Sequence, residues 1–174
     1  MERKELVAYA AGIFDGEGTV SISRIRERKG TVDHSPRMSI IVVQKVPCSL
    51  DLLIELFGGK RHKVTRRNRL HDYWRWVLTA KRAADALTEM LPYLREKREQ
   101  AYAAIEFQDH MNAVHHHRGN PIPEEVKRYR QQMAEYVSAL KRRAGAETEC
   151  DDHGMSVGSP WKRQSSPDGW ETSG

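Results

Sequence analysis

The sequence predicts an α+β domain built on one four-stranded antiparallel sheet with helices on one face. Apolar residues recur at helical spacing at the start of the chain, between residues 47 and 57, and after residue 79. Alternating apolar and polar residues between these segments indicate two pairs of strands. The order helix, two strands, helix, two strands, helix is typical of folds that place sheet and helices in separate layers.

The strands are predicted from two-residue alternation. Val20 and Ile22 alternate with serines, which gives one apolar and one polar face. Residues 37–45 repeat the pattern, and residues 72–79 place two tryptophans and a leucine on one face, with Arg75 on the other. Each strand is therefore expected to bury one face against the helices and expose the other.

Proline and glycine mark the ends of the helices. Pro47 precedes the second helix, and Gly58-Gly59 follows it. Leu91-Pro92 separates the third helix from a long fourth one. We expect helices over residues 2–14, 48–57, 79–90, 93–116 and 124–142, and strands over residues 19–26, 37–45, 60–65 and 72–79.

Charge divides the chain into a basic body and an acidic tail. Residues 145–174 hold six acids and two bases, a net charge of −4, so residues 1–144 carry +9 and the whole chain +5. We expect residues 1–144 to form the domain, and residues 145–174, rich in Gly, Ser and Pro, to be disordered or loosely attached. The basic body favours a polyanionic partner, although a merely soluble basic protein would show the same excess.

The cysteines and the hydropathy pattern indicate a soluble intracellular protein. Cys48 and Cys150 are the only cysteines, and they lie too far apart in sequence to suggest a disulfide framework. No secretory segment follows Met1, and no apolar run has membrane-spanning length. We expect no membrane partner.

The segment 8–18 joins an apolar helix to two acids separated by glycine. Three small residues at positions i, i+3 and i+4 would share one helix side, where they let two helices approach closely. Asp15 and Glu17 follow at the C-terminal end, where negative charge costs roughly 0.3–1 kcal/mol unless a cation is present. Ordinary turn acids would give the same pattern, but the flanking helix and strand favour a Mg²⁺ site. The small residues are Ala8, Ala11 and Gly12.

Residues 10–18, AAGIFDGEG, resemble the signature of the LAGLIDADG homing endonucleases. That family cuts long DNA sites with paired motif helices and divalent metal ions. The resemblance implies that Glu17 is the metal-binding catalytic acid, that the Gly16 carbonyl is a weaker ligand, and that Asp15 is more structural. It implies Mg²⁺, for which Mn²⁺ substitutes, and no small-molecule cofactor. Ala10 and Glu17 depart from the signature, which has Leu and Asp there.

The resemblance extends over roughly residues 6–104 and implies two more catalytic residues. Residues 43–45 look like the family's strand end, where a Gln positions active-site water, and Gln44 matches it. Residues 91–101 are similar to the segment whose Lys stabilises charge near the scissile phosphate, and Lys97 matches it. From the pattern alone, Gln44 could equally be a buried amide, and Lys97 an exposed helix lysine.

The family's motif count predicts the assembly. One motif per chain implies a homodimer, and this chain has one. The dimer would cut both strands of a near-palindromic site across the minor groove and leave 3′ overhangs. The expected interface residues are Ala8, Ala11, Gly12 and Asp15.

The polar face of the sheet is expected to read double-stranded DNA in the major groove. Strand alternation places Arg37 and Arg75 outward, so these two are the candidates for base edges. Most other contacts would go to phosphates. The expected DNA-binding residues are Ser21, Ser23, Arg24, Arg26, Arg28, Arg37, Ser39, Arg61, Lys63, Arg66, Arg67, Arg69 and Arg75.

Two other functions fit the sequence. The chain could be a nucleic-acid-binding module that has lost cleavage, either an intron RNA maturase or a DNA-binding regulator. It could also be a structural protein whose basic face neutralises acidic partners, which leaves the motif at residues 10–18 without a role. The run His115–His117 is not expected to bind metal, because consecutive helical side chains point about 100° apart.

Overall fold

The computed structural model describes residues 2–23, 36–65, 72–114 and 122–146. These residues form a four-stranded antiparallel sheet with helices on one face, which confirms the predicted α+β fold. The elements in chain order are α1 (Arg3–Glu17), β1 (Gly18–Ile22), β2 (Met38–Gln44), α2 (Cys48–Phe57), β3 (Lys60–Val64), β4 (Tyr73–Thr79), α3 (Ala80–Met90), α4 (Arg98–Ala113) and α5 (Glu124–Ala146).

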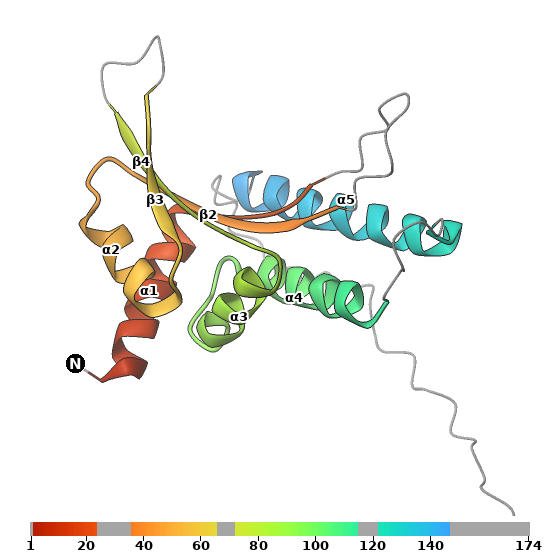
Figure 1. Cartoon of the computed structure of the whole chain (residues 1–174), viewed down its shortest axis with the longest axis horizontal. Coiled ribbons are helices and arrows are strands. Elements are labelled where there is room, and N and C mark those ends of the chain that lie inside the picture. Colours follow the sequence, from red (N-terminus) through yellow and green to blue (C-terminus); the bar gives the residue numbers. More distant parts are fainter. Residues whose placement is uncertain (1, 24–35, 66–71, 115–121, 147–174) are drawn as a thin grey trace, which may run out of the picture.

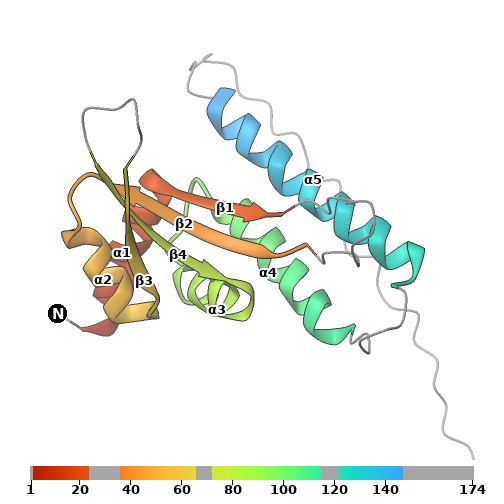
Figure 2. The same cartoon turned by 45° about the horizontal axis from the view of Figure 1, so that its top comes forward.

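The sheet has the strand order β1-β2-β4-β3, and every neighbouring pair is antiparallel. Helices α1 to α4 cover one face, as Figure 1 shows. Helix α5 lies alongside the edge strand β1 and packs against α4 (Figure 2). The opposite face of the sheet is therefore left open over β2, β4 and β3.

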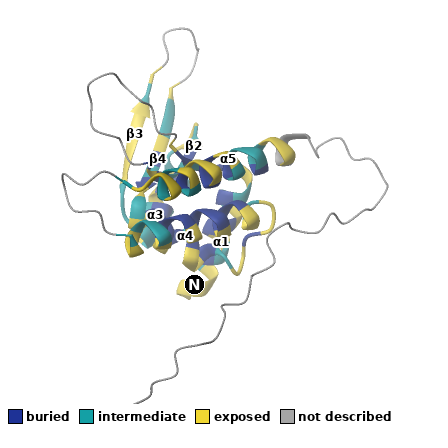
Figure 3. Ribbon diagram, turned by 90° about the vertical axis from the view of Figure 1, so that its right-hand side faces the viewer, coloured by how far each residue is buried: buried dark blue, intermediate teal, exposed yellow. Residues whose placement is uncertain are grey.

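The core lies between the sheet and the helices. Strand alternation sends Val20, Ile40 and Trp76 inward, and all three are fully buried. Phe14 of α1 and Phe107 of α4 meet them from the helical layer. Figure 3 shows the buried residues on the sides of the helices that face the sheet.

Helix α1 is longer than predicted, because Gly16 does not end it. The helix stops at Glu17, and the Gly18 N–H donates to the Phe14 carbonyl. A Cβ at Gly18 would lie 2.3 Å from that carbonyl oxygen and 2.5 Å from the Phe14 ring. Glycine is required at Gly18 by this close approach, and the chain then enters β1 directly.

Helix α4 is shorter than the predicted helix over residues 93–116. It begins at Arg98, because residues 91–97 form a turn whose main-chain N–H groups bond to Asp15. The last helix runs to Ala146 rather than to residue 142. The predicted end of the second helix at Gly58-Gly59 is confirmed, and the Trp76 Nε1–H donates to the Gly58 carbonyl at 2.9 Å.

The predicted strand over residues 19–26 is observed as β1 up to Ile22, and the rest of that range lies largely outside the described residues. The predicted tail, residues 145–174, lies outside them from residue 147 onward. Within the described part of the chain, no helix is both long and apolar enough to cross a membrane.

Candidate functional site

The C-terminal end of α1 brings together the three predicted catalytic residues. Glu17 is the last residue of α1, and its side chain is exposed. Gly18, the next residue, pairs with Val42 in the β1–β2 register. Because β2 runs only two residues further, its last residue, Gln44, lies at the same end of the sheet as Glu17.

Gln44 lies on the core-facing side of β2. It shares strand parity with Ile40 and Val42, which are fully buried, and its own side chain is half-buried. It lies opposite Trp74 of β4. The amide is therefore held at the rim of the core, beside the junction of α1 and β1.

Lys97 reaches the same helix end through Asp15. The two carboxylate oxygens of Asp15 accept the main-chain N–H groups of Arg95 at 2.7 Å and Lys97 at 3.0 Å. The Lys97 amino group in turn donates to the main-chain carbonyl of Asp15. Asp15 thus joins the turn before α4 to the end of α1 and positions Lys97 there.

These bonds fix the environment of Asp15. Its carboxylate, predicted to lie at a subunit interface, is engaged inside its own protomer. The bonds agree with the structural role expected for this acid. They also explain why the long fourth helix starts late, since a carboxylate that accepts N–H groups stabilises the turn before a helix.

The oxygen donors at this end suit a hard divalent cation. Glu17 offers an exposed carboxylate, and the Gly16 carbonyl precedes it in the last turn of a helix with no basic residue in that turn. Mg²⁺ binds through one or two carboxylates and fills its other positions with water and phosphate oxygens. No cluster of three or more His, Cys, Asp or Glu side chains that could hold a metal ion occurs among the described residues.

The small-residue face of α1 differs from the predicted one. Ala11 is fully buried in the protomer's own core, and Ala8 is half-buried. Gly12 and Gly16 are exposed, and a Cβ on either would meet no atom within 4 Å. The open face therefore consists of Gly12 and Gly16, with the 59% exposed ring of Tyr9 beside them.

The difference arises from the direction in which α1 packs. Helix α1 contacts α2 and α3 as well as the sheet, so Ala10 and Ala11 on that side are enclosed. The sequence held the signal for the open face, because Gly12 and Gly16 are four residues apart and share one side of the helix. The helix predicted over residues 2–14 ends before Gly16.

The open face of the sheet carries polar and basic side chains. Arg75 is exposed there, and His62 of β3 lies directly opposite it across the strand pair. Lys60, two residues before His62, lies on the same face of β3. Arg37 is exposed next to β2, and its main-chain N–H donates to the Ser23 hydroxyl at 2.7 Å. Ser39 is half-buried on this face.

Two predicted DNA-binding residues, Arg61 and Lys63, lie on the other face of the sheet. They pair with Trp76 and Trp74, whose side chains point toward the helices. Arg61 forms an ion pair with Asp51 of α2, and its guanidinium lies 5.3 Å from the centre of the Trp74 ring. Strand alternation therefore separates Arg61 and Lys63 from Lys60 and His62 of the same strand.

Lys63 has a partner of its own at the end of the hairpin. Its amino group lies 2.6 Å from the Asp72 carboxylate, and this bond is the main cause that lowers the pKa of Asp72. Lys63 is thus held beside an acid on the helical side of the sheet.

Ser21 has a partner that the sequence did not reveal. It faces the open side of β1, but its hydroxyl accepts a bond from the Lys141 amino group of α5 at 2.7 Å. Burial lowers the pKa of Lys141. This contact joins residues 120 positions apart, and no local pattern predicts it. Six other predicted contacts lie outside the described residues: Arg24, Arg26, Arg28, Arg66, Arg67 and Arg69.

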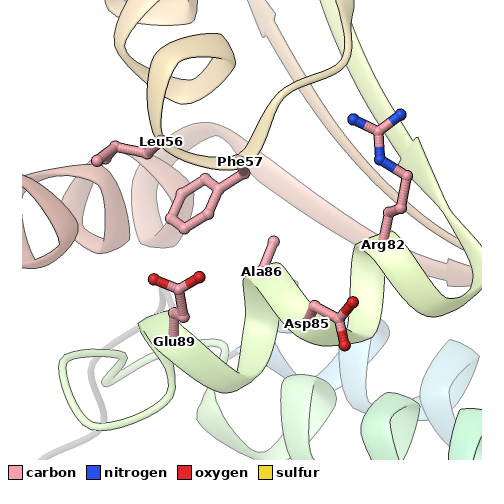
Figure 4. Close-up of a pocket in the computed structure, with 6 residues that line it drawn as sticks. All are labelled: Leu56, Phe57, Arg82, Asp85, Ala86 and Glu89. Atoms are coloured by element: carbon pink, nitrogen blue, oxygen red, sulfur yellow. The ribbon is translucent and has the colours of Figure 1, made fainter.

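A shallow pocket lies between α2 and α3, near the N-terminal end of α1 (Figure 4). Its rim acids already have partners, since Asp85 bonds to Lys81 at 2.8 Å and Glu89 to Arg3 at 2.8 Å. The pocket belongs to the helical packing and lies at the opposite end of α1 from Glu17. Its lining residues are Leu56, Phe57, Arg82, Asp85, Ala86 and Glu89.

Comparison with solved structures identifies the fold. The homing endonuclease I-CvuI, in complex with its target, matches with a TM-score of 0.52 at 17% identity, over 88% of each chain. The homing endonuclease I-TnaI matches with a TM-score of 0.54 at 16% identity, over 79% of this chain and 97% of its own.

A third solved structure also matches the chain. The LAGLIDADG homing endonuclease I-GzeII, in complex with a DNA target, matches with a TM-score of 0.55 at 12% identity, over 89% of this chain and 54% of its own. No family model and no curated protein matches the sequence. The chain therefore has the fold of the LAGLIDADG homing endonucleases.

Proposed function

We propose that the protein is a sequence-specific homing endonuclease that acts as a homodimer and cuts both strands of a long, near-palindromic DNA site to leave 3′ overhangs. The observation that carries the proposal is the convergence of Glu17, Gln44 and Lys97 at one end of the sheet. These residues come from three separate segments. An acid, an amide and a lysine at one point provide the groups that phosphodiester hydrolysis needs.

Each residue has a role that its surroundings favour. Glu17 and the Gly16 carbonyl would hold Mg²⁺, or Mn²⁺ in its place, and the ion would supply polarisation of the phosphate and activation of water. Gln44 orients the attacking water by hydrogen bonds. Lys97 donates to the phosphate oxygens as negative charge develops on them.

Two features of the single protomer support the proposed homodimer. A single Glu17 carboxylate provides few ligands for a metal ion. Cutting both strands of DNA also requires two active sites. Gly12 and Gly16 lie open on α1, and glycine inside a helix costs up to about 1 kcal/mol relative to alanine. Nothing in the described protomer requires glycine there. A partner α1 that approaches the backbone closely gives the two glycines a purpose and brings two Glu17 side chains together.

The open face of β2, β4 and β3 contacts the DNA. Arg75 and His62 lie side by side on it and point away from the core, as groups that read base edges must. Arg75→Ala is expected to cost about 1–3 kcal/mol in binding and to relax specificity at one position. Lys63→Ala, on the other face of the same hairpin, is the matched control and should change specificity at no position in a binding-site selection.

The nuclease activity is tested by cleavage of DNA that carries the uninterrupted junction of the sequences flanking this gene. With Mg²⁺, the wild-type protein should cut both strands, and Glu17→Gln should cut at least about a hundredfold more slowly. Glu55→Gln, an exposed acid of α2, is the control and should cut normally. Tight, salt-sensitive binding without metal-dependent cutting would instead identify a binding module, such as a maturase or regulator.

A further inference from the structure

Helix α1 ends in main-chain carbonyls that no basic residue in its own last turn neutralises. The C-terminal end of a helix carries partial negative charge and favours a cation. The Phe14 carbonyl accepts the Gly18 N–H, and the Asp15 carbonyl accepts the Lys97 amino group. In the described part of the chain, Lys97 thus supplies the cation that bonds to this helix end.

The same helix end holds the groups assigned to the divalent ion. The Asp15 carbonyl, the Gly16 carbonyl and Glu17 belong to consecutive residues of one helical turn. A lysine ammonium on the first and a divalent ion on the next two are close neighbours of like charge. Two positive charges on neighbouring groups of one helical turn repel each other, and the half-buried position of Lys97 limits the screening of this repulsion by water.

The anchorage of Lys97 limits what it can do. Its main-chain N–H is bonded to the Asp15 carboxylate at 3.0 Å, and its side chain is half-buried. The main chain therefore stays in place while the amino group at the end of its flexible stem can exchange one acceptor for another.

We propose that in the DNA-free protein the Lys97 ammonium opposes divalent-ion binding at Glu17. When a DNA phosphate arrives, the amino group leaves the Asp15 carbonyl for the phosphate, and the helix end becomes free for the metal ion. The proposal rests on the metal role proposed for Glu17, and it adds that DNA binding regulates metal binding there. The divalent ion binds weakly to the DNA-free protein and more tightly to the protein–DNA complex. By linkage, the bound ion increases the affinity for DNA by the same factor.

The test is a Mn²⁺ titration of the DNA-free, full-length protein, with free Mn²⁺ measured by electron paramagnetic resonance. Lys97→Met should bind Mn²⁺ roughly tenfold more tightly than the wild type, because the competing charge is gone. Lys97→Gln removes the charge but can still donate to the Asp15 carbonyl, and it should show the same gain. It also serves if Lys97→Met folds poorly.

Two controls separate charge from packing. Lys97→Arg keeps the charge and should bind Mn²⁺ as the wild type does. Lys4→Met removes an exposed lysine at the other end of α1, and it should also leave the affinity unchanged. Unchanged or weaker Mn²⁺ binding by both Lys97→Met and Lys97→Gln overturns the proposal, as does an equal gain in Lys97→Arg.

Glu17→Gln distinguishes the proposal from the function on which it rests. Loss of Mn²⁺ binding in Glu17→Gln, with no gain in the two neutral Lys97 variants, rejects the role of Lys97 and keeps the metal role of Glu17. Wild-type Mn²⁺ affinity in Glu17→Gln rejects both.

Discussion

The two sides of helix α1 have different surroundings. The side that faces the core is complete within one chain, since Ala11 and Phe14 are fully buried and Asp15 bonds to the turn before α4. The outward side presents Gly12, Gly16 and an exposed Tyr9 ring to open space. The core-facing side stabilises the fold of one chain. The outward side is the surface on which we propose that a second subunit packs.

Three glycines at the end of α1 show the same contrast between a core-facing and an open position. A Cβ at Gly18 would collide with Phe14, whereas a Cβ at Gly12 or Gly16 would touch nothing. Composition alone treats these three residues as equivalent. Their surroundings show that Gly18 serves the fold, while Gly12 and Gly16 are unexplained by it. Three substitutions test the contrast between the two sides of α1, in order of expected effect.

Gly18→Ala should have the largest effect, because its methyl group would lie 2.3 Å from the Phe14 carbonyl oxygen. We expect a loss of about 3 kcal/mol in the free energy of unfolding, at the upper end of the range for overpacked cores. Urea denaturation of the purified protein measures it. Wild-type stability in this variant would show that the close approach at Gly18 is not a constraint.

Asp15→Ala should have the next largest effect, because it leaves two N–H groups of the turn without their acceptor. We expect a loss of about 2 kcal/mol in unfolding free energy and slower DNA cleavage, since Lys97 is no longer positioned. Asp15→Asn keeps one oxygen acceptor and should lose less. Equal losses for the two variants would argue against the two-bond arrangement.

Gly12→Ala should have the smallest effect on folding and the opposite sign. Alanine is favoured over glycine within a helix, so the free energy of unfolding of the isolated protomer should rise by about 1 kcal/mol. In the proposed homodimer, the added methyl group would at the same time obstruct the partner helix and weaken dimerisation. Urea denaturation at low protein concentration measures the first effect, and sedimentation over a concentration series measures the second. A Gly12→Ala variant that dimerises more tightly than the wild type would contradict the placement of Gly12 beneath a partner helix.

Local patterns predicted most of the fold. Two-residue alternation found β1, β2 and β4, and Gly58-Gly59 marked the end of α2 correctly. The errors arose where a distant residue decides the structure. Asp15 determines where α4 begins, because its carboxylate bonds to Arg95 and Lys97, about 80 positions away. Lys141 reaches Ser21 through a fifth helix whose position no local signal contains.

The members of the candidate site were proposed from the sequence, whereas its geometry could not be. The motif at residues 10–18 and the resemblance it carries predicted Glu17, Gln44 and Lys97 as the catalytic residues, and these roles stay a prediction. Which residues face outward required the packing of α1 and the register of β3 against β4. That information moved Ala11 into the core and assigned Arg61 to the helical side of the sheet.

The central claim is that the open side of α1 is a subunit interface on which activity depends. Gly12→Leu tests it most directly, because a larger side chain there has room in the protomer and none beneath a partner helix. Sedimentation and cleavage should show a dimeric, active wild type and a folded, monomeric, inactive variant. A wild type that cuts both strands as a monomer, or a Gly12→Leu variant that stays dimeric and active, would contradict the account.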